Sequence, residues 1–419
     1  MAEVSLKRIL KLTPLFLILL FLYLSNLLTF YCEYLKNLAW IFRFSSEETS
    51  SILIGETKNR DTTIIFLVSK RLGKHFLYLI EAETGSLIKI VDLGESPVDF
   101  LYADKFLQKN SPQLLLVCSS RWILLDFNCS KLADIEFLSF EKILEVNDYD
   151  KDGFKEILYC TYSPNIHNVY VGKYLLNQSG IMLVSRYLCS LEEKVISGAL
   201  RTNHLILLSE FGNLYLMEFR GEEIFKSSIL RENVIFASIK DIDCDFKEEI
   251  IVCKSNGAVE VLEITSYRMK WIRKFPVKTL LLQSVRFTSD DESTYGLLHS
   301  TGSLLHYACC VILLKSENGI LYIINGNNGE ILWYLNLKIY NIVGEVMVDT
   351  CDYNIDGTPD IFLGNKESVY VLDGRYGLFL KKINLNKRFL YLKAYDIDKD
   401  KVIEIIIGTC NDIFALKLR

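Results

Sequence analysis

Residues 322–337 read YIINGNNGEILWYLNL, an apolar run, a short polar stretch with a glycine, and a second apolar run. This order predicts a β-hairpin, because a glycine-containing turn allows the two flanking runs to pair as strands. The same frame recurs as YLIEAETGSLIKIVDL at 78–93 and as YVLDGRYGLFLKKINL at 370–385. In all three, a glycine follows the first tyrosine by seven residues and a leucine follows it by fifteen. Residues 260–275 fit the frame without the glycine.

Equivalent hairpins recur along most of the chain. Their starting residues are Tyr78, Trp122, Tyr170, Tyr215, Glu260, Tyr322, Tyr370 and Phe414, with steps of 44, 48, 45, 45, 62, 48 and 44 residues. A period in the forties of strand-rich sequence is typical of β-propellers, in which each repeat forms one four-stranded blade. We therefore predict an all-β propeller of eight blades, with an insertion within about 286–310. Seven blades are the alternative, if the weak repeat near Tyr215 or the long step is misread.

The last repeat is incomplete, because IFALKLR (413–419) leaves no residues for an outer strand. LAWIFRF at 38–44 is similar to KWIRKF and LWYLNL, the outer strands of other repeats. We predict that 38–44 pairs with the C-terminal blade and closes the ring, so that no sheet edge stays open. The propeller domain would then cover 33–419.

Acidic residues alternate in DYDKDGFKE, residues 148–156, just before an apolar run. Carboxylates so close together repel one another unless a cation lies among them, and Ca²⁺ prefers such oxygen ligands. The predicted ligands at positions 1, 3, 5, 7 (through the backbone carbonyl) and 9 are Asp148, Asp150, Asp152, Phe154 and Glu156. Gly153 would permit the sharp turn, because glycine tolerates a positive φ. The loop is not an EF-hand, whose bidentate glutamate at position 12 is replaced here by Tyr159.

Three further segments repeat this spacing, each before an apolar strand. The ligands predicted in them are Asp241, Asp243, Asp245 and Glu249; Asp352, Asn354, Asp356, Thr358 and Asp360; and Asp396, Asp398, Asp400 and Glu404. The position of Gly153 is again a glycine, Gly357, in one of these segments, and is Phe246 or Lys401 in the other two. Metal-free turns are the alternative, because aspartate side chains also accept hydrogen bonds from their own turn backbone. Four copies at one spacing favour a Ca²⁺ cofactor.

The acidic loops resemble the DxDxDGxxD calcium loops of FG-GAP repeats, as in integrin α-subunit propellers and related VCBS proteins. The hairpins resemble quinoprotein-type (PQQ-like) blade repeats, and together the two resemblances cover about 38–419. They imply a propeller with structural calcium in its inter-strand loops. The Phe-Gly and Gly-Ala-Pro signatures of FG-GAP repeats are missing from this sequence. Integrin ligand binding is therefore not carried over.

Residues 12–32 contain no charged side chain, and three basic residues precede them. The run is long enough for a membrane-spanning helix, and positive residues stay on the cytoplasmic side. We predict a cytoplasmic tail at 1–11, a single transmembrane signal-anchor helix at 12–32, and a propeller on the extracytoplasmic side. A cleaved signal peptide is the alternative. Its apolar core would be only about 7 to 15 residues long and followed by small residues.

The chain has 11 cysteines. Cys160 and Cys253 each stand 12 residues after the first aspartate of an acidic loop, where Gly364 and Gly408 stand in the other two repeats. A position shared with glycine predicts a crowded core site, in which cysteine acts as a small apolar residue. An extracytoplasmic chain also raises the expectation of a disulfide. The candidates for it are Cys129, Cys189, Cys244 and Cys351.

The formal net charge of −5 and the lack of a basic cluster argue against nucleic-acid binding. The five histidines form no HExxH pattern, and the sequence has no GxSxG elbow and no phosphate loop. We therefore predict a non-enzymatic, membrane-anchored binding, adhesion or scaffold module. Its partner would be an unidentified protein or glycan. A propeller enzyme of the quinoprotein-dehydrogenase type is the alternative.

Overall fold

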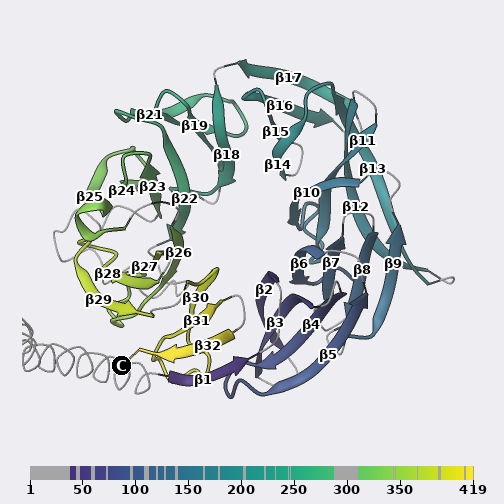
Figure 1. Ribbon diagram of the computed structural model, residues 1–419. Helices are drawn as coiled ribbons and strands as arrows, with labels where there is room; N and C mark the ends of the chain where they lie inside the picture. Colours follow the sequence, from purple (N-terminus) through teal and green to yellow (C-terminus); the bar gives the residue numbers. More distant parts are fainter. Residues whose placement is uncertain are drawn as a thin grey trace, which may run out of the picture.

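Antiparallel sheets follow one another around a ring in the computed structural model (Figure 1). The structure describes residues 38–418 apart from 44–47, 58–61, 72–73, 95–97, 108–112, 119–120, 127–128, 137–139, 164–165, 178–179, 202–203, 221–222, 232, 244, 246, 287–309, 343, 345, 366, 386–387 and 410–411. The predicted tail at 1–11, the predicted anchor at 12–32 and nearly all of the predicted insertion lie outside the described residues. Among those described, no helix is long and apolar enough to cross a membrane.

The described strands form eight sheets of four strands each. From the centre of the ring outward, the first four sheets contain β2 (Glu48–Thr57), β3 (Thr62–Arg71), β4 (Lys74–Glu81) and β5 (Leu87–Gly94); β6 (Val98–Asp104), β7 (Gln113–Cys118), β8 (Arg121–Asp126) and β9 (Lys131–Glu136); β10 (Phe140–Asn147), β11 (Glu156–Ser163), β12 (Ile166–Asn177) and β13 (Gly180–Leu191); and β14 (Val195–Arg201), β15 (His204–Ser209), β16 (Asn213–Arg220) and β17 (Glu223–Arg231).

The remaining four sheets continue around the ring in chain order (Figure 1). They contain β18 (Val234–Lys240), β19 (Glu249–Lys254), β20 (Ala258–Glu263) and β21 (Met269–Lys274); β22 (Thr279–Arg286), β23 (Cys310–Ser316), β24 (Ile320–Asn325) and β25 (Ile331–Asn336); β26 (Met347–Cys351), β27 (Asp360–Asn365), β28 (Ser368–Leu372) and β29 (Phe379–Asn384); and β30 (Tyr391–Tyr395), β31 (Glu404–Gly408), β32 (Asp412–Lys417) and β1 (Leu38–Arg43). A short 3₁₀ helix, η4 (Leu337–Tyr340), follows β25. The predicted all-β class is confirmed.

The two ends of the described chain meet in the last sheet. Strand β1 is its outermost strand and lies antiparallel to β32, with Ile41 opposite Phe414 and Phe42 opposite Ile413. Figure 1 shows this sheet beside the one formed by β2 to β5. Strand β1 and strand β2 therefore follow each other in the chain but belong to different sheets.

The hydrophobic core is divided among the interfaces between neighbouring sheets. Eight clusters of buried apolar side chains each draw on two consecutive sheets. One of them joins the last sheet to the first, with Ile406 and Ile413 packed in the same cluster as Ile65 and Ile80. The second strand of a sheet has neighbours on both faces, so it is apolar at nearly every position, as in β7 and β31.

Tryptophans on outer strands pack onto the next sheet. The indole N–H of Trp271 on β21 donates to the carbonyl of Gly326 at 2.7 Å, and that of Trp333 on β25 donates to the carbonyl of Gly374 at 3.1 Å. A Cβ atom on Gly329 would lie 2.7 Å from the Trp271 ring, and one on Gly377 equally close to the Trp333 ring. The glycine of the predicted frame therefore also makes room for a tryptophan of the preceding sheet.

The predicted core role of Cys160 and Cys253 is confirmed, because both are fully buried. The disulfide expectation is wrong for the described candidates, since Cys129, Cys189 and Cys351 carry free thiols. The reason is spatial: these three cysteines lie in different interfaces between sheets and so do not meet. Burial in apolar surroundings raises the pKa of the Cys129 thiol to about 11. Cys244 lies outside the described residues.

Candidate cation-binding loops

The four acidic segments occupy the same place in four different sheets, between the innermost strand and the second strand. We name them by their first residue: the 148 loop (148–156) joins β10 to β11, the 241 loop (241–249) joins β18 to β19, the 352 loop (352–360) joins β26 to β27, and the 396 loop (396–404) joins β30 to β31. In three of them, carboxylate oxygens of three acids lie within 4.8 Å of one another. The structure therefore gathers the acids that the sequence predicted to act together.

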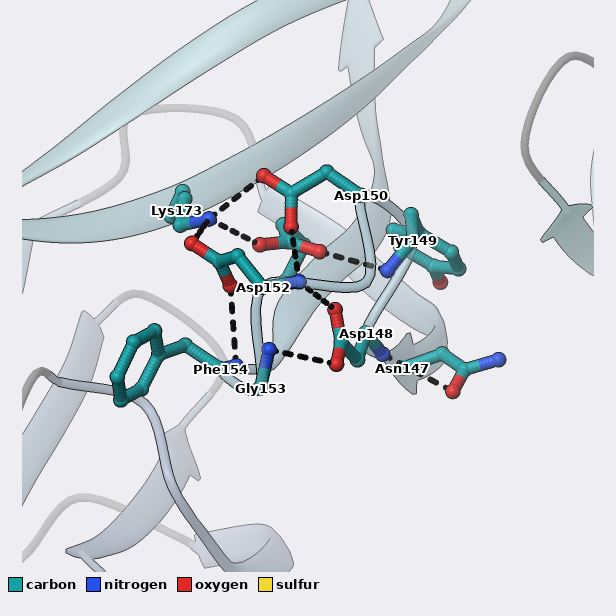
Figure 2. Close-up of polar contacts among 9 residues, drawn as sticks. Asn147, Asp148, Tyr149, Asp150, Asp152, Gly153, Phe154 and Lys173 are labelled. Carbon is teal, nitrogen blue, oxygen red and sulfur yellow. Dashed lines mark hydrogen bonds and ion pairs between the residues drawn. The ribbon is translucent and has the colours of Figure 1, made fainter.

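In the 148 loop, the acidic side chains accept hydrogen bonds from backbone N–H groups of the same loop (Figure 2). The carboxylate of Asp148 accepts hydrogen bonds from the backbone N–H groups of Asp152 at 3.1 Å and Gly153 at 2.9 Å. The carboxylate of Glu156 reaches back and accepts from the N–H of Tyr149 at 2.7 Å. These bonds satisfy amides that a tight turn would otherwise leave without partners.

The 352 and 396 loops repeat this geometry closely. Asp352 accepts from Asp356 N–H at 3.1 Å and from Gly357 N–H at 2.9 Å, while Asp396 accepts from Asp400 N–H and Lys401 N–H at the same two distances. In all four loops, the acid at position 9 accepts from the N–H at position 2. Hydrogen bonding within the loop is thus a shared property of the repeat.

Positive φ angles recur at positions 4 and 6 of these loops. The angles are 61°, 59° and 59° at Lys151, Ile355 and Lys399, and 88°, 81° and 69° at Gly153, Gly357 and Lys401. The predicted use of glycine for the sharp turn is confirmed in two loops. Lys401 adopts the same left-handed backbone with a side chain present, so a missing glycine does not change the shape of the 396 loop.

A lysine that the sequence analysis missed lies inside the 148 loop. The ammonium group of Lys173, on β12, lies 2.7 Å from the carboxylate of Asp150, 2.6 Å from that of Asp152 and 2.9 Å from that of Glu156 (Figure 2). The contact with Glu156 is an ion pair whose angle departs from hydrogen-bond geometry. Partial burial lowers the pKa of Lys173, but the contacts that its ammonium group makes with the carboxylates outweigh burial, so the pKa is raised.

Two other loops also hold a lysine. In the 396 loop, the ammonium group of Lys417 lies 2.6 Å from Asp398, 2.7 Å from Asp400 and 3.2 Å from Glu404. In the 241 loop, the ammonium group of Lys270 contacts Asp243 and lies 2.9 Å from Glu249; Asp245 is not among its partners. Each of these lysines lies on a strand that follows its loop in the chain, but the sequence does not single it out, since β21 also carries Arg273 and Lys274.

The 352 loop is different. Leu372 on β28 pairs with Ile361, and the next residue is Asp373, an acid at the place where the 148 and 396 loops have Lys173 and Lys417. Asp360 is fully buried and accepts three backbone hydrogen bonds, from Tyr353 at 3.0 Å, Asn354 at 3.2 Å and Gly374 at 3.1 Å. The ion pairs of the described residues join no lysine or arginine to Asp352, Asp356 or Asp360, whereas Arg375 contacts the hydroxyl of Thr358 in this loop.

Calcium in proteins takes about six to eight oxygen ligands at about 2.3 to 2.6 Å. The residues of the 352 loop offer side-chain oxygens of Asp352, Asn354, Asp356 and Asp360 and the carbonyl of Thr358. The guanidinium of Arg375 donates to the hydroxyl of Thr358 at 2.8 Å and leaves that carbonyl to an ion, so the loop fits calcium. In the other three loops, an ammonium group contacts the carboxylates that an ion would need. Calcium fits there only if the lysine moves away, so the predicted ligand sets of these loops stay predictions.

The buried acid of the 352 loop predicts a pH dependence of stability. Burial raises the pKa of Asp360 from 3.8 to about 6, although three backbone amides oppose the shift. The folded state therefore binds a proton more tightly than the unfolded state. Without metal, this contribution to stability is complete below pH 3.8 and is lost as the pH rises through about 6.

We expect the unfolding free energy of the chelator-treated protein to fall between about pH 4 and pH 7. Burial also raises the pKa of Glu156, Glu249 and Glu404, with the same sign. The variant Asp360→Asn removes the contribution of this one carboxyl group. Denaturant unfolding of wild type and variant at about pH 4 and at about pH 7 measures that contribution. A fall of the same size in wild type and variant would contradict the assignment to Asp360.

No protein-family model and no curated protein matches this sequence. Its fold is similar to that of many solved structures, including Sqt1 and BamB. Sqt1 from Saccharomyces cerevisiae superposes with a TM-score of 0.60 at 10% identity, over 91% of this chain and 99% of that one. BamB from Moraxella catarrhalis gives 0.51 at 12% identity, over 91% of this chain and 98% of that one. Both are β-propellers.

This chain is a β-propeller. The predicted propeller class is therefore confirmed, and the identities are so low that the likeness concerns the fold alone. The resemblances to FG-GAP and PQQ-like repeats stay hypotheses.

Proposed function

We propose that this protein is a membrane-anchored, extracytoplasmic propeller of eight blades that binds a protein partner on its outer rim and holds Ca²⁺ in the 352 loop. The eight blades and the closed ring are supported by eight four-stranded sheets, by β1 lying beside β32, and by the cluster that joins the last sheet to the first. The anchor is supported by the uncharged run at 12–32.

The observation that carries the binding function is an apolar patch on the β12–β13 hairpin. Both strands have 12 residues, whereas most other strands have five to eight. Leu175 pairs directly with Met182, and Val184 lies two residues further on the same face of β13. These three side chains, which we call the β13 patch, are 42%, 45% and 44% exposed.

Contiguous exposed apolar side chains on a soluble surface mark interaction sites, whereas single ones are ordinary. Methionine is enriched in protein interfaces. The β13 patch consists of aliphatic side chains and Met182, so it favours a protein partner over a glycan. Lys173 pairs with Val184, so the patch begins next to the 148 loop.

Site-specific photo-crosslinking tests this function. A full-length chain with a photo-crosslinking residue at Met182 should give one discrete crosslinked protein in the cells that express it. Leu175→Asp combined with Val184→Thr should remove that product at a cost in stability of no more than about 1 kcal/mol, because substitutions at the surface usually cost about 0.5 kcal/mol each. A crosslinker at Tyr334, which is 68% exposed on β25, is the control. The same product from both positions, or none from Met182, would overturn the proposal.

Calcium in the 352 loop has a separate test. Calcium at a hundred times its dissociation constant should stabilise the folded protein by about 2.7 kcal/mol. Thermal unfolding of the full-length chain with calcium and with chelator measures the effect. Asp352→Asn combined with Asp356→Asn should remove it, because two of the loop's negative charges are lost. An equal calcium response in this variant would show that the ion binds elsewhere.

A further inference from the structure

We infer that the 148, 241 and 396 loops are closed by the protein's own ammonium groups and exclude calcium while these are in place. The lysines are Lys173, Lys270 and Lys417. FG-GAP-like sequence patterns imply a metal ion in all four loops, whereas the arrangement of side chains fits one in the 352 loop alone. The inference does not depend on whether the 352 loop binds calcium.

The lysines contact the same positions of the repeat. Lys173 and Lys417 each contact the acids at positions 3, 5 and 9, and Lys270 contacts those at positions 3 and 9. These are three of the five positions at which calcium would find its ligands. One ammonium group therefore lies where the ion is expected, and not beside it on the loop surface.

The ammonium group comes from the third strand of the sheet in two loops and from the outermost strand in the other. Lys417 on β32 faces Glu404 directly, and Lys173 on β12 follows Gly172, which faces Ile157 beside Glu156. Lys270 instead comes from β21, the outermost strand of its sheet. By both routes an ammonium group reaches the carboxylates at positions 3 and 9, so the placement does not follow from a single strand register.

Burial explains why these loops need a cation. The position 9 acids Glu156, Glu249 and Glu404 are each no more than 5% exposed. A buried carboxylate is costly without an opposite charge close to it. The lysine side chains are only 22%, 21% and 18% exposed, so they give up most of their hydration to reach these acids.

Calcium cannot bind beside the lysine. Its bonds to oxygen are about 2.3 to 2.6 Å long, and the ammonium group already contacts the carboxylates at positions 3 and 9. The two cations would also repel each other at this distance. Calcium therefore has to displace the lysine, whose aliphatic stem is held by the strand on which it lies.

The test uses the full-length chain with Asp352→Asn and Asp356→Asn, so that the 352 loop no longer responds to calcium. In this background, calcium should leave the melting temperature unchanged and give no heat of binding. Adding Lys417→Met should create one calcium site, with affinity at least about tenfold above the background and a melting temperature that rises with calcium. Lys399→Met is the matched control, because it removes one exposed lysine from the same loop and should create no site.

Two results would overturn the inference. One is calcium binding by the background protein that Asp398→Asn abolishes. The other is a folded Lys417→Met variant without a calcium response, with Lys173→Met tested in the same way if the first variant does not fold. Wild-type protein gives an independent readout through reductive methylation and mass spectrometry. Lys417 should react more slowly than Lys399 with and without calcium, and a rise in its reactivity on adding calcium would also overturn the inference.

Discussion

Replacing Trp271 with alanine is expected to lower the free energy of unfolding by about 3 to 5 kcal/mol, the usual cost of removing a buried large aromatic side chain. The ring lies against Gly329 of the next sheet, and its N–H donates to the carbonyl of Gly326 at 2.7 Å. The substitution therefore leaves a void between two sheets and a carbonyl without its donor.

Gly329→Ala is expected to be destabilising for two reasons. The new Cβ atom would lie 2.7 Å from the Trp271 ring, and the backbone at Gly329 has a φ of +72°. In the double variant with Trp271→Ala the clash with the ring disappears. The loss of unfolding free energy in the double variant should therefore be smaller than the sum of the losses in the two single variants. Denaturant unfolding of the four proteins gives this coupling energy directly.

Tyr334→Ala is the matched control, because this aromatic residue on an outer strand is 68% exposed. It should change stability by no more than about 0.5 kcal/mol. A loss below about 1 kcal/mol for Trp271→Ala, or strictly additive costs for the pair, would show that the tryptophan does not hold the two sheets together.

The second large effect concerns ring closure. Ile406→Ala is expected to cost about 2 to 5 kcal/mol, because its fully buried side chain packs in the cluster between the last sheet and the first. Ile323→Ala removes an equally buried isoleucine from an interface between two sheets that are consecutive in the chain. In a closed ring the two substitutions should cost similar amounts.

Denaturant midpoints of the two variants make the comparison. If the ring were open between the last sheet and the first, Ile406 would lie at a wet edge, and its loss would cost far less than that of Ile323. A cost below about 1 kcal/mol for Ile406→Ala, beside a full cost for Ile323→Ala, would contradict closure.

The features that could be predicted from the sequence are mostly local. The glycine at position 329 and the tryptophan at 333 belong to one hairpin, so their spacing indicates the blade repeat directly. The acids at positions 1, 3, 5 and 9 of the 148 loop accept hydrogen bonds from amides only a few residues away, and their alternation predicts a common loop shape.

The features that could not be predicted depend on strand register. Lys417, Lys173 and Lys270 follow the last acids of their loops by 13, 17 and 21 residues, a separation that varies with strand and turn length. Nothing in the local pattern says which of several lysines turns toward the acids. The disulfide expectation failed for a different reason: Cys129, Cys189 and Cys351 lie in three different interfaces between sheets, and their spacing in the sequence does not show this.

The position of β1 beside β32 has a consequence for how the protein is made. A ribosome adds about 5 to 20 residues per second, so β1 waits about 20 to 75 s for its partner strand to be synthesised. Until then, β1 has no partner strand and the first sheet lacks the neighbour that covers one of its faces. Apolar surface exposed for so long invites aggregation. We expect nascent chains to depend on chaperones that shield this face until the last strand emerges.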